Sequence, residues 1–310
     1  MFNVGIVGCG KRFRKVYLKV IFTLQKKKLL KIIKINSLQS NIKDIAKKLN
    51  CKIEANIDSI IKDKKINLIF ILVPINLRKK IFLNKNLKNK YIFCEVPFSN
   101  HLGDYFYYKK ILNNKKIKFE IFEDRFFQKN YQHKLNKIKI ITNFNIEWMH
   151  HALGAIFQLN KKIKVIKKIN FIHDNYYDIY KIYFNNLIFL YKFAKKKRDA
   201  NRKLGYIEIL NKTNKKIIYN KNFLRIKKNK IFNLKEQALY DSINNFLFKN
   251  NKSKFYSEKY LEIEQLTITL MKIMKKFNIN FINSSGVKFI YILCKVYGYL
   301  LFYKKKISDY

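Results

Sequence analysis

Residues 2–122 alternate short apolar runs with longer amphipathic stretches. Uncharged, β-branched runs predict strands that are buried on both faces, and apolar positions at helical spacing predict helices between them. The predicted strands are Phe2–Val7, Lys31–Ile35, Leu68–Val73, Tyr91–Glu95 and Lys118–Phe122. The predicted helices are Phe13–Lys27, Ile42–Leu49, Leu77–Lys88 and Leu102–Leu112. This alternation is typical of repeated βαβ units, which form a doubly wound parallel sheet with helices on both faces.

The pattern changes near Arg125, where apolar runs follow one another with short polar gaps, as in an antiparallel sheet. Strands are predicted at Ile163–Ile172, Ile179–Phe184, Leu187–Phe193, Tyr206–Leu210 and Lys216–Tyr219, and helices at Glu147–Leu159, Leu234–Phe248 and Glu258–Phe277. The fold class is therefore α/β, with a C-terminal α+β domain that contains a mainly antiparallel sheet. We place the first domain at residues 1–124 and the second, for substrate binding and dimerisation, at residues 125–310.

The chain is strongly basic, with a formal net charge of +47, which would ordinarily indicate a polyanionic partner. Of its 67 basic residues, however, only seven are arginines, and the lysines are spread along the whole chain. Lys, Asn, Ile, Tyr and Phe are encoded by A- and T-rich codons, so drift of the genome is sufficient to produce the excess, and the charge is weak evidence of function. Because nucleic-acid recognition favours Arg for bidentate contacts, we expect no nucleic-acid partner.

Four cysteines stand alone, with no metal-ligand spacing to a second Cys or to His: Cys9, Cys51, Cys94 and Cys294. They are interpreted as reduced, buried side chains, and no metal site is expected. The chain has no long apolar stretch at its start, which favours a cytoplasmic protein. The apolar segment Val287–Tyr303 is interrupted by two lysines and is shorter than the roughly 20 residues of a membrane span. It is expected to be a packed or surface helix.

The strongest motif is Gly5-Ile6-Val7-Gly8-Cys9-Gly10, where the first predicted strand turns into the first helix. Gly8 permits a tight turn, and Gly10 allows close approach of a pyrophosphate to the helix N-terminus. The motif predicts a Rossmann domain, with Cys9, Lys11 and Arg12 in the same cofactor site. Phe13 occupies the place of the third glycine of the usual fingerprint, which crowds the contact between helix and strand.

After the second predicted strand, Asn36 and Ser37 stand where an acidic residue would bind the ribose of NAD. With Ser40 and Lys43 nearby, a 2′-phosphate is tolerated, which favours NADP weakly over NAD. The alternative is that these residues form a simple polar loop.

The two prolines, Pro74 and Pro97, follow the third and fourth predicted strands, at the edge where open α/β sheets bind ligands. The glycine turn, the Val73-Pro74-Ile75-Asn76 segment and the Cys94-Glu95-Val96-Pro97 segment together resemble the GFO/IDH/MocA oxidoreductases. The resemblance implies a nicotinamide cofactor and adds Val73, Pro74, Asn76, Glu95 and Val96 to the expected site. In that family a lysine lies between Glu and Pro, and here Val96 replaces it.

The segment Glu147-Trp148-Met149-His150-His151 resembles the family's helix that handles the substrate proton, with Gly154 in place of its last acid. Glu147 and His151 share one helical face at this spacing, so the carboxylate can orient an imidazole suited to proton exchange near neutral pH. The alternative is that the helix only packs against the cofactor domain. Arg125 follows the fifth predicted strand and is expected to contact cofactor or substrate, or to pair with Glu123 or Asp124.

These observations predict an NAD(P)-dependent oxidoreductase that transfers a hydride between nicotinamide and a small alcohol, carbonyl or imine, with His151 and Glu147 as catalytic residues. A biliverdin-reductase-like NADPH reductase, which also lacks the lysine, and a non-catalytic dinucleotide binder are the alternatives. A lysine-rich nucleic-acid binder is a further, less favoured alternative. A small-molecule substrate and no membrane span are expected. A homo-oligomer formed through the C-terminal sheet is left open.

Overall fold

A computed structural model describes residues 1–99, 101–114, 117–122, 138–143, 166–173, 177–184, 188–194, 207–211, 216–219 and 233–248, together with residues 265 and 268. The chain forms two compact units. The first unit comprises Met1–Gln128 and Ile226–Thr269, and the second comprises Lys129–Arg225 and Leu270–Tyr310.

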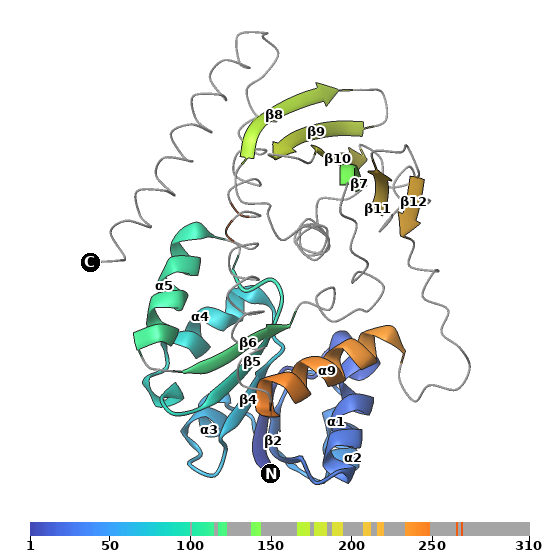
Figure 1. The fold of residues 1–310 in the computed structure, drawn as a ribbon. Coiled ribbons are helices and arrows are strands. Elements are labelled where there is room, and N and C mark those ends of the chain that lie inside the picture. The colour runs from blue at the N-terminus through green and yellow to red at the C-terminus, as the bar shows by residue number, and fades with distance from the viewer. Residues whose placement is uncertain are drawn as a thin grey trace. The chain divides into compact units, whose positions relative to one another are not determined.

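A parallel sheet of six strands forms the first unit (Figure 1). Its strand order is β3-β2-β1-β4-β5-β6, so the order reverses direction between β1 and β4. The strands are β1 (Phe2–Val7), β2 (Leu30–Asn36), β3 (Lys52–Ile53), β4 (Leu68–Ile71), β5 (Tyr91–Glu95) and β6 (Lys118–Phe122). The doubly wound parallel sheet predicted from the alternating pattern is confirmed, and β1, β5 and β6 have the predicted bounds.

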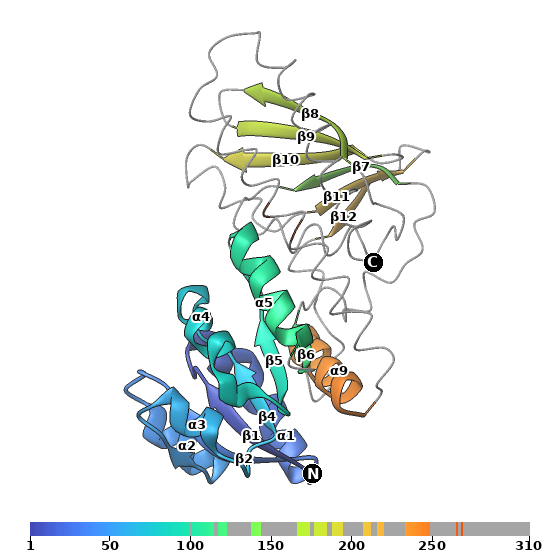
Figure 2. The same ribbon diagram turned by 90° about the vertical axis from the view of Figure 1, so that its left-hand side faces the viewer.

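Helices cover both faces of this sheet (Figures 1 and 2). One face carries the π-helix η1 (Phe13–Tyr17), α1 (Leu18–Lys26) and α2 (Ile42–Leu49). The other carries α3 (Ile57–Lys62), α4 (Ile75–Leu83), the 3-10 turn η2 (Lys85–Leu87) and α5 (Leu102–Asn114). The sequence did not predict β3 or α3, because elements of two and six residues are too short to show a period.

The core of the first unit lies on both faces of the central strands. All four residues of β4 are buried, as are the last four of β1, which explains why these runs carry no charge. On the face of η1, edge-to-face, tilted and stacked ring pairs join Tyr17, Phe70, Phe93 and Phe122, with centroids 5.0–6.3 Å apart. Aromatic pairs of this kind add to the stabilisation that comes from burial alone.

A helix from far along the chain completes that face. The helix α9 (Leu234–Phe248) has the predicted bounds, and it packs beside α1 and β6 in the first unit (Figure 1). Its Phe246 ring lies 5.9 Å from the ring of Tyr91 and 6.1 Å from that of Phe93. The predicted boundary at residues 124 and 125 assigned this helix to the second domain. The structure differs because β4, β5 and β6 need a cover on the face that their own crossover helices leave open.

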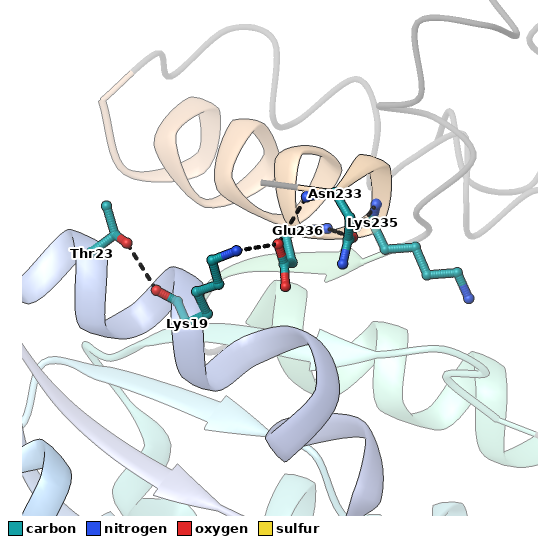
Figure 3. Close-up of polar contacts among 5 residues, drawn as sticks. All are labelled: Lys19, Thr23, Asn233, Lys235 and Glu236. Atoms are coloured by element: carbon teal, nitrogen blue, oxygen red, sulfur yellow. Dashed lines mark hydrogen bonds and ion pairs between the residues drawn. The ribbon is translucent and has the colours of Figure 1, made fainter. Parts of the chain in front are cut away.

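The start of α9 is a reciprocal cap that also contacts α1 (Figure 3). Asn233 Oδ1 accepts hydrogen bonds from the N–H groups of Lys235 and Glu236, each at 3.0 Å. Glu236 Oε2 accepts the Asn233 N–H at 2.8 Å and the Lys19 ammonium at 3.2 Å. The cap provides acceptors for amides that have none within the helix. The contact with Lys19 joins α9 to α1.

The second unit contains a six-stranded sheet of order β12-β11-β7-β10-β9-β8 (Figure 2). Its strands are β7 (Ile138–Asn143), β8 (Ile166–His173), β9 (Tyr177–Phe184), β10 (Ile188–Ala194), β11 (Ile207–Asn211) and β12 (Lys216–Tyr219). Neighbouring strands run antiparallel except β7 and β10, which pair in parallel. The sequence did not predict β7, whose short apolar run is broken by Lys139.

Within the described residues, no helix is both long enough and apolar enough to cross a membrane. The segment Val287–Tyr303 and most of the helix predicted at Glu258–Phe277 lie outside the described residues.

We expect Asn233→Ala to lower the free energy of unfolding by about 1 kcal/mol, because two amides at the start of α9 lose their acceptor. Lys19→Gln should cost less, because the Lys19 side chain is 53% exposed and ion pairs of exposed side chains contribute little. Urea denaturation followed by circular dichroism measures both. Equal losses in the two variants would contradict the assignment of the cap as the larger contribution.

Candidate functional site

In the turn after β1, two segments of the main chain approach each other closely. Gly8 has a φ of +98°, a conformation that L side chains rarely adopt. A Cβ at this residue would lie 2.8 Å from the Leu72 carbonyl carbon and 2.9 Å from the Val73 nitrogen. The Gly8 N–H donates to the Asn36 carbonyl at 2.8 Å, so the turn is fixed between the ends of β2 and β4. Only glycine fits at this position.

Gly10 stands in different surroundings. A Cβ built on it would meet nothing within 4 Å among the described residues. The Arg14 N–H donates to the Gly10 carbonyl at 3.1 Å, so the amides of Lys11, Arg12 and Phe13 precede the first helical hydrogen bond. Main-chain N–H groups beside open space at a helix N-terminus form a site that fits a phosphate group.

Phe13, which replaces the third glycine, is accommodated by a change in the helix. The first helix begins with a π-helical turn, in which the Leu18 N–H donates to the Phe13 carbonyl. Phe13 is 1% exposed, and its ring stacks on Tyr17 with centroids 6.3 Å apart. The wider π-turn therefore lets two large rings share the space under the helix, where a small residue was expected.

The polar residues at the end of β2 and just after it have different roles in the structure. The Asn36 side chain is buried, and its amide nitrogen donates to the carbonyls of Glu54 and Ala55 at 2.8 and 3.0 Å. Asn36 thus anchors the neighbouring chain segment. Ser37 Oγ accepts the Gln39 N–H at 3.3 Å, and the Leu38 side chain between them is 96% exposed. The loop that starts at Ser37 is therefore the part of this region that faces outward.

Glu95, the last residue of β5, joins the first helix to the carboxyl edge of the sheet. One carboxylate oxygen accepts the Tyr17 hydroxyl at 2.7 Å and the Arg12 Nε–H at 3.0 Å. Burial raises the pKa of the Tyr17 hydroxyl well above its usual range, and the Glu95 charge adds to this, so Tyr17 stays protonated and donates. The sequence placed Arg12 and Glu95 in one site, and the structure brings them together.

Arg78 is a residue of this region that the sequence reasoning missed. It lies on α4 and is only 3% exposed. Its Nε donates to the Val73 carbonyl at 3.0 Å, and its Nη1 donates to the carbonyls of Glu95 and Pro97. A signal was available: arginine is scarce in a chain so rich in lysine, and its fork is the feature that lysine cannot supply.

The other expected residues of this edge surround the same place. Val73 is buried, whereas Pro74 and Asn76 at the start of α4 are exposed. Val96, in the place of the family's lysine, is of intermediate exposure, and its peptide bond to Pro97 is cis. Glu147, His151 and Arg125 lie outside the described residues.

The cysteines of the described part of the chain are free thiols. Burial raises the pKa of Cys9, in the glycine turn, to about 12 and that of Cys51 to about 11. Both are therefore protonated and unreactive at neutral pH. Over the described ranges, no group of three or more His, Cys, Asp or Glu side chains is placed to hold a metal ion.

Residues 2–121 match the GFO/IDH/MocA family model, described as an oxidoreductase family with an NAD-binding Rossmann fold. The family resemblance inferred from the glycine turn and the Glu95-Val96-Pro97 segment is thereby confirmed over this part of the chain. No curated protein sequence matches the chain.

Solved structures with the same fold include an oxidoreductase from Thermotoga maritima, with a TM-score of 0.66 at 13% identity over 86% of this chain and 94% of that one. Myo-inositol 2-dehydrogenase from Lactobacillus plantarum gives 0.63 at 12% identity, over 86% and 95% of the two chains. Biliverdin reductase from Synechocystis, solved with biliverdin and NADP+, gives 0.62 at 10% identity, over 87% and 98%. These similarities establish a shared fold.

The two glycines of the turn should respond differently to substitution. Gly8→Ala should lower the free energy of unfolding by about 1–3 kcal/mol, because the methyl group meets main-chain atoms in a strained conformation. Gly10→Ala should change it by less than about 1 kcal/mol, because its methyl group enters open space. Denaturation of both variants without nucleotide measures this, and a Gly8→Ala protein as stable as the wild type would refute the close approach.

Proposed function

We propose that this protein is an NAD(P)-dependent oxidoreductase that transfers a hydride between nicotinamide and a small alcohol, carbonyl or imine substrate. The observation that carries the proposal is the turn at Gly8 and Gly10, which joins β1 to a helix N-terminus where the strand order reverses. Open α/β sheets bind dinucleotides at this point, outside the carboxyl ends of the strands. The match to the oxidoreductase family supports the same reading.

The residues of the site supply binding and orientation. In this proposal Gly10, Lys11 and Arg12 hold the pyrophosphate, and the loop at Ser37 faces the adenosine ribose. The nicotinamide, when bound, would be the hydride donor or acceptor. Because the end of β2 carries Asn36 and Ser37 and no acidic side chain, we propose a weak preference for NADP over NAD. Arg125 is proposed as a further contact to cofactor or substrate.

We propose that the second unit forms the substrate domain. We also propose that His151 exchanges the substrate proton while Glu147 orients the His151 imidazole. The Glu95 carboxylate is a poor alternative, since it already accepts hydrogen bonds from Tyr17 and Arg12. A biliverdin-reductase-like reduction is the second candidate. It is favoured by Val96, which leaves the Glu-Lys-Pro position without a titratable group.

Either nucleotide should raise the melting temperature of the wild-type protein, with NADPH giving the larger shift. A nucleotide at 100 times its dissociation constant stabilises the folded state by about 2.7 kcal/mol. Gly10→Leu should remove the shift and leave the protein folded, because its side chain fills the open space where a phosphate would lie. If neither nucleotide stabilises the wild type at millimolar concentration, the proposed function is wrong.

Replacing His151 separates an enzyme from a degenerate binder. His151→Ala should lower the turnover rate by ~10²–10⁴ with nucleotide affinity nearly unchanged, because general acid–base catalysis contributes on that order. Glu147→Gln should cost less, because the proton donor remains. Steady-state rates and nucleotide titrations measure both effects. A folded His151→Ala protein that binds cofactor and turns over at the wild-type rate would exclude His151 as the proton donor.

A further inference from the structure

The buried guanidinium of Arg78 joins two chain segments that are distant in sequence. It binds the Val73 carbonyl, just after β4, and the carbonyls of Glu95 and Pro97, at the end of β5 and just after it. All three acceptors belong to the main chain, so the contacts fix the backbone of both segments. Among the described residues, no acidic side chain forms an ion pair with Arg78. A buried charge without such a partner is costly, and the three carbonyls offset that cost only while both segments keep their positions.

The segment that begins at Glu95 is held from both faces of the sheet. On the face of η1, the Glu95 carboxylate accepts hydrogen bonds from Tyr17 and Arg12. On the face of α4, the Glu95 carbonyl accepts the Arg78 Nη1–H. Val96 follows between the two carbonyls that Arg78 binds, so its backbone has little freedom to shift.

The strand order places this segment in one half of the site. The sheet reverses between β1 and β4, and a dinucleotide lies across that crevice with its adenosine over β1, β2 and β3. The ends of β4 and β5 then border the nicotinamide half. On the basis of the proposed function, we propose that Arg78 is a positioning residue for the nicotinamide half of the cofactor, acting through the main chain at Val73, Glu95 and Pro97.

This inference is tested by comparing a whole dinucleotide with the fragment that lacks nicotinamide. Calorimetric titration gives the dissociation constants of NADPH and 2′-phospho-ADP-ribose, or of NADH and ADP-ribose if NADH binds the wild type more tightly. Arg78→Met should weaken the dinucleotide by about tenfold or more, because charge-assisted hydrogen bonds are lost. The fragment should bind within about twofold of wild type, since β1, β2 and the glycine turn are unchanged.

Lys90→Met is the matched control. Lys90 is also a buried cation, and its ammonium donates to the carbonyls of Asp63 and Ile66. It precedes β5 and so lies at the amino end of that strand, whereas Arg78 binds the carboxyl ends. Its replacement should lower the melting temperature and leave the affinity ratio of dinucleotide to fragment unchanged. This control separates a general loss of stability from a loss of positioning.

Arg78→Lys keeps the charge without the fork and serves if Arg78→Met does not fold. It should show the same selective loss to a smaller degree. The inference is overturned if the folded Arg78 variants weaken dinucleotide and fragment by the same factor, or weaken neither. A wild-type protein that binds neither ligand would instead refute the proposed function itself, so the two failures are distinguishable.

Discussion

The first unit depends on the main-chain contact between Gly8 and the end of β4. A Cβ on Gly8 would lie 2.8 Å from the Leu72 carbonyl carbon, so the main chain just after β4 limits the path that the chain can take out of β1. The hydrogen bond from the Gly8 N–H to the Asn36 carbonyl fixes the same turn to β2. This turn fixes where the first helix begins.

Two contacts across the sheet follow from that placement. The side chains of Arg12 and Tyr17 extend from the first helix, and both donate hydrogen bonds to one carboxylate oxygen of Glu95 at the end of β5. The π-turn at Phe13–Tyr17 sets the spacing of these residues and lets the Phe13 and Tyr17 rings stack in the core. A carboxylate, a guanidinium and a hydroxyl thus connect strands and helices that the parallel topology alone leaves unlinked.

The helix α9 shows how a later segment of the chain completes the first unit. The crossover helices α4 and α5 cover β4, β5 and β6 on one face (Figure 2). On the other face, the Phe122 ring lies against Tyr17 of η1 and the Phe93 ring against Phe246 of α9. Phe246 of α9 covers Phe93, and Glu236 binds Lys19 of α1. The domain is therefore discontinuous in sequence, because the apolar surface of the sheet is larger than its own helices can bury.

The amino-acid sequence by itself determined the alternation of strands and helices, because period and burial are written locally in runs such as Leu68–Ile71. It also determined the glycine turn, since a φ of +98° is a property of one residue. Only the tertiary structure decided where α9 lies, that Asn36 anchors Glu54 and Ala55, and that Arg78 joins Val73 to Glu95. The Asn36 and Arg78 contacts join side chains to main-chain carbonyls, and every residue has a carbonyl. The sequence therefore does not show which carbonyl accepts the hydrogen bond from a given side chain. That carbonyl is determined only when the sheet forms and brings the strand ends together.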